Sequence, residues 1–415
     1  MSMELLCKSC ADERQSGRPV ITAVVCQECF EYATTEVGNL EGVRGKPEIR
    51  IQSEFINPQL RSTRLPNEVG TIIDVSPIST QARSTWLLLA EDGAIAQFDA
   101  GTGEWKRLAC SSLASESDHK PWCGHFLKQR LHAAPGGDFA AIVNDYGRYG
   151  QLVDLRTGQV TLALDGGDYH AETVPFSFAF AQVNGHALAI HRTNWNRLDV
   201  SDPATGALLT ARNPTSYRDG EERPVHYLDY FHGALHVSPN SVRISDDGWV
   251  WHPVGIPTTW TLKPWISDNV WESEDGPTRK AVCAREYYWD HAVTWLDDQR
   301  MAIGGIGDDD DDMVDGARIF DVSSPGRGIV RWCHDWPYPR ELTAFAGPAG
   351  SFFSEGHALF SSDAEGLSRW DVNDGSRTGY LQGFKPMYHH RGARELVQLV
   401  DGAFVRWTID NGEPC

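Results

Sequence analysis

The chain lacks the long apolar run that a membrane span requires. Its 415 residues are 41% hydrophobic and 23% charged, which is a globular composition, and no stretch approaches the ~18 consecutive apolar residues of a transmembrane helix. The first six residues carry Glu4 where a secretory signal needs positive charge, and their apolar stretch is too short for such a signal. We therefore expect a soluble cytoplasmic protein with no membrane partner.

Positive charge is also scarce. Lys and Arg number 37 against 57 Asp and Glu, so the formal net charge is −20. A surface of this sign repels phosphate and gains little from counterion release, which disfavours DNA or RNA as a partner. A basic protein or a cation is the better match. Most of the positive residues are Arg rather than Lys, which suggests a bacterial source with a GC-rich genome.

Familiar catalytic motifs are missing as well. The sequence contains no His-Glu-x-x-His, no Gly-x-Ser-x-Gly and no Gly-x-x-x-x-Gly-Lys. Cys123 and His125 lie two residues apart, but no third member of a nucleophilic triad can be assigned to them. We therefore assign no catalytic residue. An enzyme whose site is built from polar residues at the ends of inner strands stays open as an alternative.

Cysteine is present in one informative pattern near the N-terminus. Two Cys-x-x-Cys pairs are separated by fifteen residues, as in tetrathiolate zinc sites, where each pair supplies two sulfurs to one tetrahedral ion. Four sulfurs leave no open coordination position, so we predict a structural zinc ion in a small zinc-ribbon-like module over residues 1–40, followed by a linker at 41–46. Paired disulfides are the alternative. The predicted ligands are Cys7, Cys10, Cys26 and Cys29.

Turn glycines recur along the rest of the chain. Each follows a short apolar strand pattern, most of them also precede a second one, and helical periodicity is nearly absent. A period near 50 residues with one long interval is typical of a β-propeller, whose four-stranded blades bury their faces against their neighbours. We predict an all-β fold with seven blades, six or eight being the alternatives. The marker glycines are Gly103, Gly158, Gly206, Gly255, Gly326, Gly375 and Gly412.

Closure of the ring requires a strand from elsewhere in the chain. Too few residues follow Gly412 to complete a seventh blade. Residues 48–55 alternate like a strand and have no other partner, so we predict that they pair outside residues 403–409. Apolar runs such as residues 86–90 and 139–144 are the expected innermost strands. The propeller would then span residues 47–415.

The strand, turn and strand around Trp370 and Asp371 resemble a blade of the WD40-like propeller superfamily. The resemblance covers about residues 47–415. It implies a ring of blades, and it assigns no activity because propellers carry many different functions. The repeats depart from the family pattern in that no regular Gly-His precedes the blades.

The long interval between two turn glycines coincides with a Trp-rich insertion at about residues 263–285. This segment is too polar for a blade strand and too aromatic for a plain linker. Large rigid aromatic residues dominate interface hot spots, so we predict a partner-binding surface here. The alternative is that the segment folds over its own blade. The predicted binding residues are Trp265, Trp271, Glu272, Glu274 and Asp275.

A run of aspartates at residues 308–312 could hold Ca²⁺, most plausibly through Asp308, Asp310 and Asp312. The spacing is not that of an EF-hand, and a solvated acidic turn is the competing interpretation. Taken together, these features favour a non-enzymatic interaction scaffold that binds a protein partner through an acidic face and the Trp-rich insertion. A funnel-site enzyme and a calcium or small-ligand sensor are the alternatives.

Overall fold

The computed structural model of the chain describes residues 59–409 apart from 115, 117–121, 123, 214–216, 218–219, 252, 324–338 and 348–349. All described residues belong to one compact unit, which comprises residues 49–329 and 339–415. The four predicted zinc ligands, the predicted linker and residues 48–55 lie outside the described part of the chain. Among the helices described, none has the length and apolar character needed to cross a bilayer.

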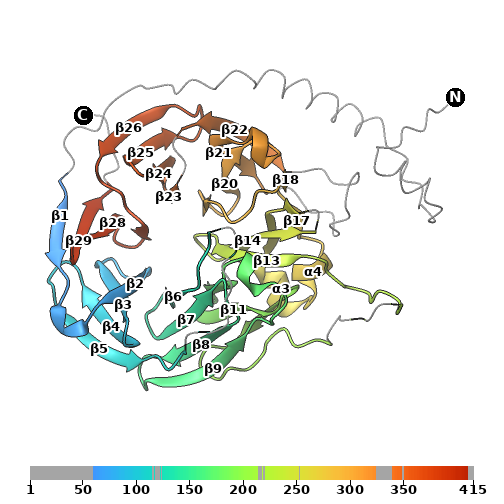
Figure 1. Ribbon diagram of the computed structural model, residues 1–415, viewed down its shortest axis with the longest axis horizontal. Coiled ribbons are helices and arrows are strands. Elements are labelled where there is room, and N and C mark those ends of the chain that lie inside the picture. Colours follow the sequence, from blue (N-terminus) through green and yellow to red (C-terminus); the bar gives the residue numbers. More distant parts are fainter. Residues whose placement is uncertain are drawn as a thin grey trace. The chain divides into compact units, whose positions relative to one another are not determined.

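Seven antiparallel sheets form the blades of a propeller, and they are arranged as a ring around a common axis (Figure 1). The prediction of an all-β, seven-bladed fold is confirmed. Blade 1 contains β2 (Ile72–Pro77), β3 (Thr85–Ala90), β4 (Ala94–Asp99) and β5 (Trp105–Cys110). Blade 2 contains β6 (Lys128–Ala133), β7 (Phe139–Asp145), β8 (Tyr149–Asp154) and β9 (Gln159–Asp165). Blade 3 contains β10 (Phe178–Val183), β11 (His186–Asn194) and β12 (Arg197–Ser201).

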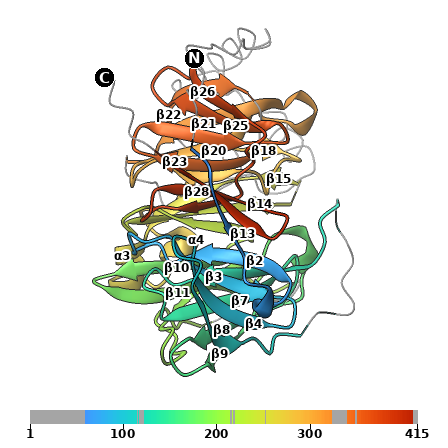
Figure 2. The same cartoon turned by 90° about the vertical axis from the view of Figure 1, so that its left-hand side faces the viewer.

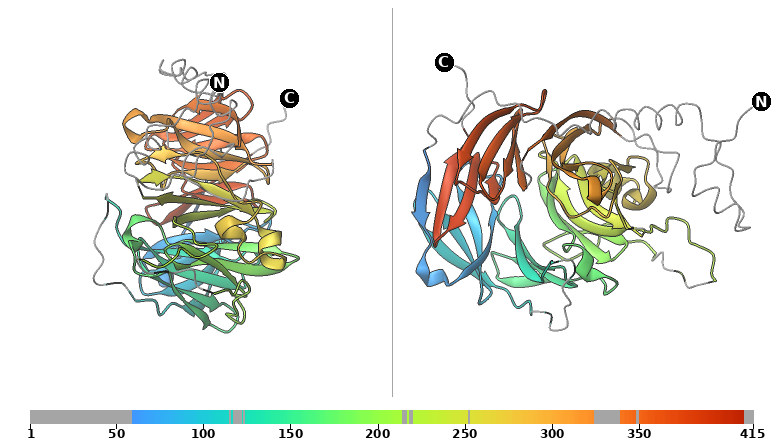
Figure 3. Two further views of the ribbon diagram at one scale, coloured as in Figure 1. Left: turned by 90° about the vertical axis from the view of Figure 1, so that its right-hand side faces the viewer. Right: turned by 45° about the horizontal axis from the view of Figure 1, so that its top comes forward.

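Blade 4 is the irregular one. Its sheet contains β13 (Phe231–Val237), β14 (Arg243–Val250), β15 (Val254–Gly255), β16 (Thr258–Thr261), β17 (Lys280–Ala281) and β18 (Arg285–Glu286). Two short helices, α3 (Leu262–Ser267) and α4 (Glu272–Asp275), are inserted between β16 and β17 and lie beside blade 3 (Figures 2 and 3). Gly255 therefore belongs to a strand, and its prediction as a hairpin turn is wrong.

The remaining blades return to the regular pattern. Blade 5 contains β19 (Val293–Trp295), β20 (Arg300–Ile306), β21 (Val314–Asp321) and β22 (Arg340–Ala346), and blade 6 contains β23 (Ser351–Glu355), β24 (Ala358–Ser362), β25 (Gly366–Asp371) and β26 (Arg377–Gln382). Blade 7 contains β27 (Tyr388–His390), β28 (Glu395–Val400) and β29 (Ala403–Thr408), joined by β1 (Arg61–Arg64). Three single turns of 3₁₀-helix occur in loops: η1 (Asn67–Val69), η2 (Ala171–Thr173) and η3 (Asp310–Asp312).

Four of the predicted turn glycines close outer hairpins in the same way. Gly103, Gly158, Gly206 and Gly375 all have positive φ, between 69° and 80°. In each turn the glycine N–H donates to the carbonyl of an aspartate four residues earlier, over 2.7 to 2.9 Å. That aspartate also accepts a backbone N–H two residues on through its side chain. The Asp-x-x-x-Gly spacing is therefore a physical repeat, because Gly alone adopts the left-handed conformation without cost. Gly326 and Gly412 lie outside the described residues.

Ring closure uses an N-terminal strand, as expected, but a different one. The outer edge of β29 pairs antiparallel with β1, from Arg61 opposite Arg406 to Arg64 opposite Ala403, and the two strands lie side by side in Figures 1 and 3. The other edge of β29 pairs with β28. Both edges are occupied, so the prediction that residues 48–55 close the ring is corrected to β1. Arg61–Arg64 was missed because its four residues carry no apolar alternation.

The most apolar runs are the second strands of the blades and not the innermost ones. Residues 86–90 belong to β3 and residues 139–144 to β7, and every residue of these two strands is buried. A second strand is sandwiched between blades on both faces, as in the cluster that joins Leu87 and Leu89 of blade 1 to Ala140 and Ile142 of blade 2. An innermost strand such as β6 lies next to the axis of the ring instead, is less buried, and carries more polar residues.

Candidate functional site

The Trp-rich insertion is folded into the propeller. Trp265 of α3 is fully buried, packs edge-on against Trp260 with ring centroids 5.6 Å apart, and belongs to the core formed with Leu198 and Val200 of blade 3. Its indole Nε1 donates to the Val270 carbonyl over 3.3 Å. This burial leaves no surface for a partner, so the expectation that Trp265 is a binding residue is corrected.

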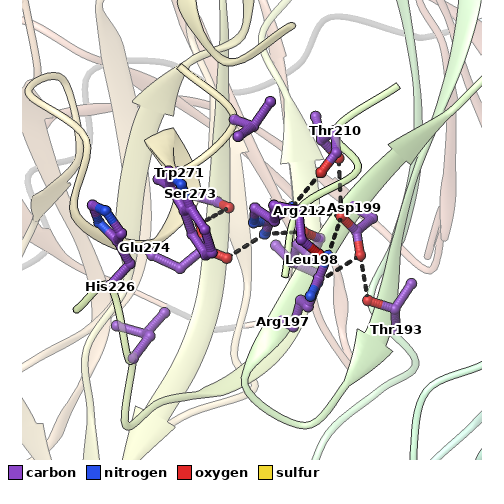
Figure 4. Close-up of polar contacts among 12 residues, drawn as sticks. Thr193, Arg197, Leu198, Asp199, Thr210, Arg212, His226, Trp271, Ser273 and Glu274 are labelled. Carbon is purple, nitrogen blue, oxygen red and sulfur yellow. Dashed lines mark hydrogen bonds and ion pairs between the residues drawn. The ribbon is translucent and has the colours of Figure 1, made fainter. Parts of the chain in front are cut away.

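The acidic residues of the insertion are buried as well. Glu274 forms an ion pair with Arg212, whose Nη1 lies 2.5 Å from Asp199 Oδ1, and both side chains of the Arg212–Glu274 pair are almost inaccessible (Figure 4). Arg197 and Thr193 donate to the other oxygen of Asp199 over 2.9 and 2.6 Å. The Arg212 guanidinium therefore joins blade 3 to the insertion. Buried charges of this kind are retained only when they are paired and hydrogen-bonded.

The other predicted binding residues are also engaged internally. Glu272 is buried and accepts hydrogen bonds from the Thr278 hydroxyl over 2.6 Å and from its backbone N–H over 2.8 Å. Trp271 is half-buried, stacked on His226 at 4.6 Å and covered by the Arg212 guanidinium at 5.2 Å. Asp275 accepts from His226 Nδ1 over 2.8 Å. The segment is therefore folded onto the propeller, as the alternative interpretation held, and it packs against blade 3 as well as against its own blade.

The aspartate run forms the exposed turn η3. Asp309 caps it by accepting the backbone N–H of Asp311 over 3.0 Å, and Asp308 lies 3.2 Å from Arg318 Nη1. Within the described part of the chain, no three His, Cys, Asp or Glu side chains are arranged to hold a metal ion. The turn is thus a capped acidic loop with one of its charges already paired.

A different group of aromatic residues lies open on one face of the ring. Its centre is a stack in which Trp249 lies parallel to Phe231 on one side, with ring centroids 4.3 Å apart, and to Trp289 on the other, at 4.9 Å. Neighbouring strands are antiparallel, so the start of β13 and the end of β14 reach the same face, and Phe231 is paired with Trp249. We call this set the aromatic cluster: Tyr169, His170, Trp195, Phe231, Trp249, Trp251 and Trp289.

The centre of the aromatic cluster is buried, and its edge is exposed. Phe231 and Trp249 are almost inaccessible, whereas Tyr169 is 45% exposed and Trp251 is 44% exposed. Trp251 packs edge-on against Trp249 at 5.1 Å and against His170 at 5.3 Å. In the sequence, Trp249 and Trp251 alternate with Val250, which predicts that both tryptophans pack in the core. For Trp251 this prediction is wrong, because β14 ends at Val250 and Trp251 lies in the turn that follows.

A polar group adjoins the aromatic cluster through Asp290, which follows Trp289 in the chain. The hydroxyl of Tyr146 donates to Asp290 over 2.6 Å, and the ring of His125 stacks on Tyr146 with centroids 4.6 Å apart. Burial and the Asp290 carboxylate raise the pKa of Tyr146 well above its usual value, so the phenol stays protonated as a donor. Arg130 Nε lies 2.6 Å from Asp145, and this carboxylate raises the pKa of Arg130.

Strained backbone holds several of these side chains in place. Tyr146, His170, Tyr287 and Asp290 all have φ between 51° and 59°, a region that bulky residues avoid. Such conformations cost about 1 to 3 kcal/mol each and cluster at functional sites. Each of the four residues lies in or next to the aromatic cluster or the polar group. Of the nine non-glycine residues with positive φ in the described part of the chain, these four lie at this face and five lie elsewhere, so the strain is consistent with a candidate functional site here but does not single it out. The indole of Trp289 donates to the Thr173 carbonyl over 3.1 Å.

Comparisons with known proteins identify no family and no function for the chain. No protein-family model matches the chain, and no curated protein matches it. Among solved structures, 1128 chains match. One is a chain in the crystal structure of the mitotic checkpoint complex, with a TM-score of 0.49 and 10% identity over 88% of this chain and 98% of that chain. The propeller assignment rests on the seven sheets themselves.

Proposed function

We propose that this protein is a non-enzymatic interaction scaffold that binds a protein partner through the aromatic cluster. The observation that carries the proposal is the exposure of Trp251 and Tyr169 at the edge of a stack whose centre is buried. Aromatic residues held rigid by their neighbours lose little conformational entropy when they are covered, which is why they dominate binding hot spots.

The charge around the aromatic cluster favours a basic partner. Asp229 is exposed two residues before Phe231, and Glu172 lies 3.4 Å from the ring of His170. Asp168 is exposed next to Tyr169 and lies 3.6 Å from Arg148 Nη1. Lys and Arg side chains pair with such carboxylates and are attracted to the faces of Trp and Tyr. The formal net charge of −20 also attracts basic partners over longer distances.

The proposal is tested with full-length protein and three sets of synthetic peptides, in which basic positions are retained, replaced by Gln, or replaced by Glu. We expect binding only in the basic set, weakening as salt is raised. The double variant Trp251→Ala/Tyr169→Ala should weaken that binding at least about tenfold. The matched control is Trp105→Ala, because Trp105 is 36% exposed on β5, the outer strand of a different blade. Unchanged binding by the double variant would contradict the proposal.

The predictions of a zinc site, a cytoplasmic location and a bacterial source remain predictions from the sequence. Zinc held by Cys7, Cys10, Cys26 and Cys29 in a ribbon-like module concerns residues outside the described part of the chain. A cytoplasmic location and a bacterial source likewise rest on the composition and the cysteine pattern. A zinc ribbon would add a second rigid module to the scaffold, since its metal replaces a core too small to fold alone.

A further inference from the structure

A cavity of about 320 Å³ lies on the face of the ring opposite to the aromatic cluster. It is bordered by the C-terminal ends of innermost strands, among them Ser76 of β2, His132 of β6, His236 of β13 and Thr294 of β19, with Arg391 following β27. The innermost strands surround the axis of the ring in Figure 1. The volume falls at the lower end of the range for small-ligand sites, which is about 300 to 1,000 Å³.

The polar lining of the cavity carries a single charge. Arg391 is its only ionised residue, and no Asp or Glu takes part in the lining. His132 and His236 are neutral, because burial and the nearby Arg130 charge lower the pKa of His132 to about 3 and that of His236 to about 4. The Nε2 atoms of both imidazoles are buried without a hydrogen-bond partner. An electropositive cavity is unexpected in a chain whose net charge is −20.

Arg391 is held by backbone and hydroxyl groups rather than by a carboxylate. Its Nη2 donates to the Trp295 carbonyl over 3.2 Å and to Ser354 Oγ over 3.3 Å. Among the described residues it forms no ion pair. The two acidic residues whose charges act on it are engaged elsewhere: Glu355 lies 3.0 Å from Arg394 Nε, and Asp298 accepts from the Asn240 amide over 2.8 Å.

The loop that presents Arg391 packs closely against blade 1. A Cβ added at Gly392 would lie 2.4 Å from the Ser79 carbonyl oxygen and 2.3 Å from that of Gln81, so only glycine allows this approach. The guanidinium is thereby fixed between blades 5, 6 and 7. A half-buried cation loses part of its hydration, and here no neighbouring carboxylate compensates for that loss. A bound oxyanion would compensate for it by forming charge-assisted hydrogen bonds with the guanidinium.

We propose that this cavity binds a small molecule with one oxyanion group, carboxylate or phosphate, which Arg391 recognises, while the apolar remainder packs against Phe178, Phe180 and Val237. The hydroxyls of Ser76 and Thr294 supply further donors of the type that such a group accepts. The site is independent of the aromatic cluster, which lies on the other face.

The test measures binding to full-length protein by calorimetry. The probes are benzoate and phenyl phosphate, with benzyl alcohol as the neutral analogue and benzylamine as the cationic one. We expect saturable binding of at least one of the two anions, with one site per chain, and at least about tenfold weaker binding of the alcohol and the amine, because a charge-assisted hydrogen bond is lost. If only one anion binds, the result supports the proposal and selects between carboxylate and phosphate.

Variants localise the binding. Arg391→Met should weaken it at least about tenfold, whereas Arg391→Lys, which keeps the charge, should retain part of it. If Arg391→Met does not fold, Thr294→Val replaces it, since it keeps the side-chain shape and removes a hydroxyl donor from the cavity lining, and should weaken binding several-fold. Trp251→Ala/Tyr169→Ala should leave anion binding unchanged. Equal binding of benzyl alcohol and benzoate, unchanged affinity in Arg391→Met, or no saturable binding of either anion at millimolar concentration would overturn the proposal.

Discussion

Two Trp-rich regions of blade 4 differ in solvent exposure, and each differs from what its sequence suggests. The insertion with Trp265 and Trp271 looks like a surface loop in the sequence, since Trp alternates there with carboxylates, yet it is built into the fold. The segment at the end of β14 looks like a core strand, yet Trp251, directly after the strand, is 44% exposed. Local polarity was the wrong guide in both cases. What decides exposure is whether a segment finds a partner surface, and blade 3 supplies one to the insertion.

The carboxylates of the insertion explain how a polar segment can be buried. Glu274 can be buried because it forms an ion pair with Arg212. Glu272 can be buried because the hydroxyl and the backbone N–H of Thr278 both donate to it. A charged residue in a loop is ordinarily a sign of solvation. Here the compensating groups lie 62 and 6 residues away in sequence, and only the nearer of the two could have been suspected.

The largest loss of stability is expected from a substitution at Trp265, in the buried insertion. Trp265→Ala should destabilise the protein by about 3 to 5 kcal/mol, because it removes a fully buried indole and leaves a cavity against Trp260. The free energy of unfolding is measured by denaturant titration of the purified variant. A loss below about 1 kcal/mol would show that the insertion is detached from the core in solution.

A smaller loss is expected at the ion pair. Glu274→Ala should cost about 2 to 4 kcal/mol, less than a fully uncompensated charge, because Arg212 keeps its contact with Asp199. The double variant Glu274→Ala/Arg212→Met should recover part of the loss, since no buried charge remains without its partner. Additive losses in the double variant, measured in the same denaturant titration, would argue that the pair is not coupled.

The smallest effect on stability is expected at Trp251. Trp251→Ala should shift the melting temperature by only about a degree or two, because the side chain is 44% exposed and sits at the edge of its cluster. Trp271→Ala should shift it further, because Trp271 is stacked on His226 and under Arg212. The comparison uses thermal melts of the two variants in one buffer. A larger shift in melting temperature for Trp251→Ala than for Trp271→Ala would indicate that the insertion is exposed surface and not part of the fold.

The elements that the sequence predicted well are those set by short-range chemistry. An Asp-x-x-x-Gly turn needs only the left-handed tolerance of glycine and an aspartate to accept the backbone N–H groups, so four of the predicted turns were placed correctly. The period of these turns led to the blade number. Trp370 was also placed correctly within a blade strand, where it is buried and donates to Ser361 Oγ over 2.8 Å.

The candidate site was mostly missed, for a physical reason. The aromatic cluster joins residues 169 to 289 from three blades, and the anion cavity joins Ser76 to Arg391 from six. Neither has a local motif, although the spacing Trp249-x-Trp251 and the run of aromatics before Asp290 were visible signals of the first. Their assembly depends on the closure of the ring.

The sequence by itself therefore determined the all-β class, the repeat and its turns, because each depends on residues a few positions apart. The tertiary structure decided which strand closes the ring, which tryptophans meet solvent and where Arg391 lies. Those outcomes depend on contacts between blades, such as β1 beside β29 and Arg212 beside Glu274. The free energy of such contacts comes from surfaces that are complementary only after the chain has folded, so no local pattern encodes them.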